Sequence, residues 1–65
     1  MWRVVYIAPN QSMAETLKGA LIKEGVLVTL RSIGKGSNQT GDGSVEILVS
    51  ESEAEEAHEI INKSL

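Results

Sequence analysis

Short runs rich in β-branched and aromatic residues occur at three places along the chain, and each predicts a strand. The first is WRVVYI, residues 2–7, which Pro9 should end because proline donates no hydrogen bond to a sheet. The second is VLVTL, residues 26–30, with room to continue to Ile33. The third is SVEILV, residues 44–49, where one set of alternating positions is entirely apolar and β-branched.

Between the first two predicted strands, apolar residues recur at spacings of three and four, which predicts a helix over about residues 11–24. Its apolar stripe consists of Met13, Leu17, Ala20 and Leu21. Asn10 can cap the amino end, and a capping box of Ser12 and Glu15 is a competing start one turn later. Gly25 is expected to take the left-handed conformation that ends the helix.

A second helix is predicted after the third strand. Ser50 and Glu53 have the spacing of a capping box at its start. Glutamates crowd its first turns and Lys63 lies near its end, which suits the helix dipole. The expected buried stripe consists of Ala54, Ala57, Ile61 and Leu65.

These elements follow one another in the order β-α-β-β-α. The first strand-helix-strand unit requires a right-handed parallel crossover, and the second and third strands should form a hairpin. If the third strand lies between the first two, both helices cover one face. The predicted fold class is therefore α+β, a ferredoxin-like, antiparallel-type sheet of three strands in the order 1-3-2 that lacks the usual last strand.

Length and charge limit what the chain can do. With 65 residues, no cysteine and one histidine, it should form a single domain, residues 1–65, without disulfides or a zinc site. The net charge is −3 and the basic residues are scattered singly, so nucleic acid is not an expected partner. No signal peptide or membrane span is evident, and we expect a cytoplasmic protein with no membrane association.

The residues also resemble a known family. The opening WRVVYIAPNQSMAETLKGALIKEGVLVTL and the later EILV and SESEAEEAHEIIN are similar to small bacterial domains of unknown function that are labelled prokaryotic signal-transducing proteins. The resemblance covers almost the whole chain, mainly at packing positions. It implies a ferredoxin-like fold related to nitrogen-regulatory signalling proteins and brings no catalytic residues. The positions that carry it are the aromatic start, Ala14, Glu15, Leu17, Gly25, Ala54 and Ala57.

The stretch GKGSNQTGDG, residues 34–43, is the main candidate for ligand contact. It lacks the phosphate-loop pattern G-x-x-x-x-G-K-[ST], and it connects two strands where such loops lead into a helix. A long hairpin loop is the simpler interpretation, and no cofactor is expected. Related signalling proteins use the corresponding loop to touch partners. The available polar groups are Lys35, Ser37, Asn38, Gln39 and Thr40.

Other candidate residues favour structural roles. His58 has no serine, cysteine or aspartate at a spacing that would make a triad, and the glutamates near it suit a solvated helix face. Trp2 and Tyr6 could stack on RNA bases, but the sequence has no cluster of basic residues to accompany them. We therefore expect no catalytic or metal site. The predicted function is a non-enzymatic regulatory or protein-interaction domain in signal transduction, and the alternative is a sensor of a small anion or nucleotide that binds through the loop.

A homodimer is expected because so small a domain has a thin core. With both helices on one face, the other face should present several large apolar side chains, and such patches usually mark an interface. The expected dimer face consists of Trp2, Val4, Tyr6, Leu27, Ile33 and Leu48, with Val5 and Ile7 replacing the residues of the first strand if that strand is turned over. The free edge of the first strand is an alternative contact.

Overall fold

A computed structural model describes residues 1–33 and 43–65 of the chain. The order β-α-β-β-α is confirmed, with a short 3₁₀ turn before the last helix. The elements are β1 (Trp2–Ala8), α1 (Gln11–Lys23), β2 (Val28–Ser32), β3 (Val45–Ser50), the 3₁₀ turn Glu51–Glu53 and α2 (Ala54–Ser64).

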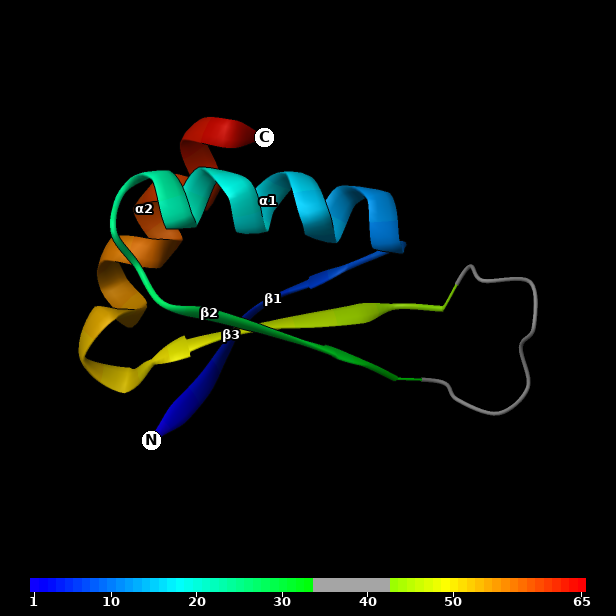
Figure 1. Cartoon of the computed structure of the whole chain (residues 1–65), viewed down its shortest axis with the longest axis horizontal. Helices are drawn as coiled ribbons and strands as arrows, with labels where there is room; N and C mark the ends of the chain where they lie inside the picture. Colours follow the sequence, from blue (N-terminus) through cyan, green and yellow to red (C-terminus); the bar gives the residue numbers. More distant parts are fainter. Residues whose placement is uncertain (34–42) are drawn as a thin grey trace.

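The strands form one sheet in the order β1-β3-β2, and β3 is antiparallel to both of its neighbours. Both helices lie on the same side of this sheet (Figure 1) and pack on each other as well as on the strands. The α+β, ferredoxin-like class and the sheet order are therefore as predicted. Because β3 is central, β1 and β2 each keep one free edge among the described elements.

The two ends of α1 are determined by Asn10 and Gly25. The Asn10 side chain accepts a hydrogen bond from the Met13 amide at 2.8 Å, so Asn10 is the cap, and the competing start at Ser12 is not used. Gly25 has φ 88°, a left-handed angle that glycine adopts without strain. The Gly25 and Val26 amides then donate to the carbonyls of Ile22 and Leu21, which is a Schellman motif.

This motif also explains why β2 starts later than predicted. The Val26 amide closes the helix end and is therefore not available for the sheet ladder, and β2 begins at Val28. Val26 is nevertheless buried in the core, as the sequence pattern suggested. The strand continues to Ser32, and the Ile33 amide adds one more bond by donating to the Ser44 carbonyl at 3.0 Å.

Two predictions about the last helix are wrong. The Ser50 side chain makes no capping bond; its hydroxyl lies 3.1 Å from that of Ser52, and residues 51–53 form the 3₁₀ turn. Leu65 is 59% exposed and does not join the buried stripe. The carboxyl end of α2 rises past α1, away from the sheet (Figure 1), so the turn beyond Ile61 has no sheet beneath it.

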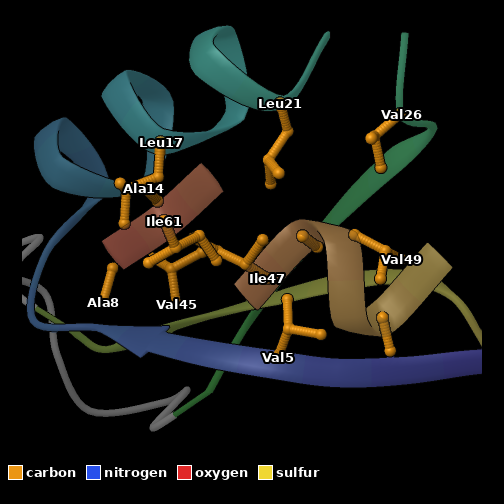
Figure 2. Close-up of a cluster of buried hydrophobic side chains, with 12 residues drawn as sticks. Val5, Ala8, Ala14, Leu17, Leu21, Val26, Val45, Ile47, Val49 and Ile61 are labelled. Carbon is orange, nitrogen blue, oxygen red and sulfur yellow. The ribbon is translucent and has the colours of Figure 1, made fainter. Parts of the chain in front are cut away.

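The core lies between the helices and the sheet. Figure 2 shows Leu17 and Leu21 of α1 pointing toward Ile47 on the central strand, and these side chains have no exposed surface. Ala14, Ala57 and the other small residues of the helices allow close approach to the strands. The remaining members of this buried cluster are Val5, Ala8, Val26, Val45, Val49, Ala54 and Ile61.

A β-bulge interrupts the pairing of β1 with β3. Val4 lies opposite Leu48 and Tyr6 lies opposite Ile47, so Val5 is an extra residue in β1. Val5 is 8% exposed and points into the core (Figure 2). The bulge therefore shifts the alternation of β1 by one residue partway along the strand.

The consequence is that β1 changes its outward residues at the bulge. Trp2 and Val4 lie on the face away from the helices, but after the bulge this face is taken by Ile7, and Tyr6 packs against the core. The prediction that Tyr6 shares a face with Trp2 and Val4 is wrong, and so is the reversed version in which Val5 points outward. A strict alternation was assumed, and the extra residue breaks it.

Replacing Leu17 with alanine should destabilise the domain strongly. Leu17 is fully buried between α1 and the sheet, and such truncations typically cost about 2–5 kcal/mol. A domain of this size has a core that rarely supplies more than about 3–5 kcal/mol, so much of the variant should be unfolded in water. Urea melts followed by far-UV circular dichroism measure the change, and a loss below about 1 kcal/mol would contradict the packing described here.

The capping assignments make a second prediction. Asn10→Ala should lower the free energy of unfolding by about 1 kcal/mol because it removes a side-chain acceptor for the Met13 amide. Ser50→Ala is the matched control, because Ser50 precedes the other helical segment without capping it, and its effect should stay within about 0.5 kcal/mol. Equal losses in urea melts of the two variants would show that α1 is not capped by Asn10.

Candidate functional site

The side of the sheet turned away from the helices is the principal candidate site. Among residues 1–33 and 43–65, no helix or strand covers it. We call it the open face. Alternation along the strands, corrected for the bulge, places the following residues on it: Trp2, Val4, Ile7, Thr29, Arg31, Glu46, Leu48 and Ser50. Leu27 and Ile33 lie directly before and after β2, next to this face.

Most of the open face is apolar and accessible. The exposed fractions are 49% for Trp2, 38% for Val4 and 52% for Ile7, and Leu27 next to this face is 70% exposed. Leu48 differs, because it lies on the central strand directly between Val4 and Thr29 and is only 6% exposed. It belongs to the open face and not to the helix-side core. The open face is thus a flat apolar platform whose centre is already close-packed.

One ion pair crosses the open face. Arg31 on β2 lies directly opposite Glu46 on β3, and both Nε and Nη2 of Arg31 approach Oε1 of Glu46 at 2.6 Å. The Glu46 side chain is 16% exposed, with Ile7 of β1 on its other side. These two are the charged side chains that the described strands place on this face, so its formal side-chain charge is zero.

The predicted dimer-face residues have different positions in the structure. Trp2 and Val4 are on the open face and exposed. Leu27 is exposed directly before β2, and Ile33 is half-buried directly after it. Leu48 is on this face too, but its own neighbours bury it. Tyr6 is on the helix side, as described above. Ile7, expected on this face only if the first strand were turned over, lies on it together with Trp2 and Val4, because the bulge changes the alternation partway along WRVVYI.

The glycine-rich stretch lies largely outside the described residues. Lys35, Ser37, Asn38, Gln39 and Thr40, the predicted ligand contacts, fall within residues 34–42, and they therefore remain sequence-based candidates. The described flanks are Ile33 and Gly43, and a side-chain carbon added to Gly43 would lie 3.1 Å from the Ile33 carbonyl oxygen. The hairpin is therefore tightly closed where it leaves the sheet.

A shallow hollow lies between the start of β1 and the start of α2. Its charged groups are Arg3, Glu51 and Glu55, His58 also lines it, and Arg3 forms an ion pair with Glu51 at 3.2 Å. His58 is exposed on α2. Arginine and glutamate satisfy each other here, and both are more than half exposed, so this pair contributes little to stability.

A second hollow separates the two helices near their ends. Lys23 and Glu24 of the first helical segment face Glu56, Glu59 and Lys63 of α2 across it. Charges of both signs alternate around it, as is usual for a solvated groove between helices. Within the described ranges, no group of three or more histidine, aspartate or glutamate side chains is arranged to hold a metal ion. Neither described helix has the length and apolarity needed to cross a membrane.

Comparisons with models of known protein families, with curated proteins and with solved structures gave no match. The function therefore has to be argued from the geometry of the open face and its surroundings.

Proposed function

We propose that this chain is a non-enzymatic protein-interaction domain and that it binds its partner through the open face. The observation that supports this most directly is the exposure of Trp2, Val4 and Ile7 on one side of a sheet. Antiparallel sheets that face water normally alternate apolar and polar residues, with the polar set outward. Here the outward set is itself largely apolar.

The shape of the open face favours a protein partner. Small-molecule sites are concave and enclose most of the ligand surface, whereas three adjacent strands present a broad, shallow surface. Tryptophan is enriched at the centres of protein interfaces, because it contributes a large contact area and loses little conformational freedom. The Arg31–Glu46 pair adds a polar, geometrically defined element within this apolar surface.

A regulatory role in the bacterial cytoplasm is part of the same proposal. It is supported by the resemblance of the sequence to small bacterial signalling domains. Such a role requires only a binding surface, because a regulatory domain can act through which partner it binds and how tightly it binds it.

Capture from cell extract tests this function. A tagged wild-type chain should retain specific proteins, and Ile7→Lys should lose them because it places an ammonium group on the apolar open face. Lysine at this position lies opposite Glu46, so the monomer keeps a favourable cross-strand neighbour and should fold. Ile22→Lys is the matched control, since Ile22 on α1 is 53% exposed, close to the 52% of Ile7.

Mass spectrometry identifies the captured proteins. An untagged copy of the same chain counts as a captured protein. The proposal expects proteins retained by the wild type and Ile22→Lys and lost by Ile7→Lys. If Ile7→Lys and Ile22→Lys retain the same set, the open face is not the binding surface and the proposal is wrong.

A further inference from the structure

We infer that the partner of the open face is a second copy of this chain. The two open faces pack against each other, and the β1 strands of the two copies run antiparallel. This inference depends on the proposal that the open face binds protein, and it identifies that protein. It is supported by the charge on the face, the state of the strand edges, the size of the face and the positions of its residues.

Charge makes the open face the most favourable place for two copies to meet. The chain has a net charge of −3, so two copies repel each other on approach. On the helix side, acidic side chains such as Glu51, Glu55 and Glu59 are exposed. On the open face, Arg31 and Glu46 neutralise each other within one chain. A copy that approaches this face therefore meets no net side-chain charge, whereas a strongly basic partner would gain nothing by choosing it.

The bulge disfavours the alternative contact through the edge of β1. An added strand would need a regular row of backbone groups along that edge, and the extra residue at Val5 disrupts the row in the middle of the strand. Bulges are one of the ways in which proteins prevent edge strands from pairing. The same bulge moves Ile7 onto the open face. One irregularity thus weakens the edge as a contact and enlarges the apolar face.

The size of the open face suits a weak dimer. The longest strand, β1, has 7 residues, which corresponds to about 23 Å, and three strands are about 14 Å wide. Because projecting side chains make the accessible area larger than the flat area, each copy would bury about 500 Å². The pair would bury about 1,000 Å², which is at the lower limit for a specific interface. We therefore expect a dissociation constant in the micromolar range, roughly 1–100 µM.

The residue positions select one two-fold arrangement. A two-fold axis along the strands would place Glu46 against the partner's Glu46. An axis across the strands near Leu48 places Glu46 against the partner's Ser50 instead, and it stacks Trp2 on the partner's Ile7. It also brings Val4 against the partner's Val4. The second arrangement joins apolar side chains along β1 and separates the like charges of Glu46, so it is the more self-complementary of the two.

Sedimentation equilibrium between about 1 µM and 1 mM tests the inference on the full chain, since these concentrations span the expected dissociation constant. Wild type should approach dimer mass at the upper end. Trp2 is the only tryptophan, so its fluorescence emission should shift to the blue over the same range as it becomes covered. Ile7→Lys should raise the dissociation constant at least about tenfold, whereas the Ile22→Lys control should change it less than about twofold.

Circular dichroism checks that each variant is folded. If Ile7→Lys is unfolded, Val4→Lys is used in its place. A wild-type monomer at about 1 mM would overturn the inference, as would equal weakening by Ile7→Lys and Ile22→Lys. The capture experiment separates the two levels of the argument. If the wild type is monomeric but Ile7→Lys still loses a captured protein, only the identity of the partner is wrong. If Ile7→Lys affects neither measurement, the binding role of the open face is wrong as well.

Discussion

The pairing of β1 with β3 determines how the apolar residues of this small domain are divided between its two faces. In a regular antiparallel pair, alternate residues keep to one face along the whole strand. Here Val5 is an extra residue, and it lets both Val5 and Tyr6 contribute to the helix side. The core gains an additional side chain, and Ile7 is transferred to the opposite face. Burial on one side and exposure on the other are two effects of the same irregularity.

The extra buried side chain matters because a chain of 65 residues has a thin core. Its largest fully buried side chains are few, namely Leu17, Leu21, Ile47 and Val49, so each additional buried group matters. Asn10 and the Schellman motif at Gly25 define the two ends of α1, which lies over the sheet. With both helices on one side, the described helices and strands leave the apolar open face uncovered.

The sequence predicted the features that depend on local chemistry and could not predict those that depend on strand pairing. Asn10, Gly25 and the Leu17–Leu21 stripe are local signals, and the structure confirms each of them. The Ser50–Glu53 spacing has the same local form but is not used as a cap, because the chain makes a 3₁₀ turn there. The crossover and hairpin rules left two places for the third strand, and the central place assumed for it is the one that the structure shows. The position of the bulge could not be predicted, because WRVVYI has large apolar residues on both faces and carries no sign of its register.

For the candidate site, the sequence predicted that the face exists but not every residue that lies on it. An apolar open face was expected from placing both helices on one side, and the register of β1 places Trp2 and Val4 on it. Tyr6 and Ile7 were exchanged because their faces depend on the bulge. The burial of Leu48 by Val4 and Thr29 is a property of side-chain packing that alternation alone does not reveal.

An isotope-filtered nuclear Overhauser experiment can detect whether the open faces of two copies, each shaped by the bulge, pack against each other. A sample that mixes labelled and unlabelled chains reports only contacts between copies. If they pack in the proposed arrangement, we expect cross-peaks between the Trp2 indole of one chain and the Ile7 methyl groups of the other, and none from the Tyr6 ring. Cross-peaks from Tyr6, or contacts between copies confined to Ile22 and Leu65 on the helices, would contradict it.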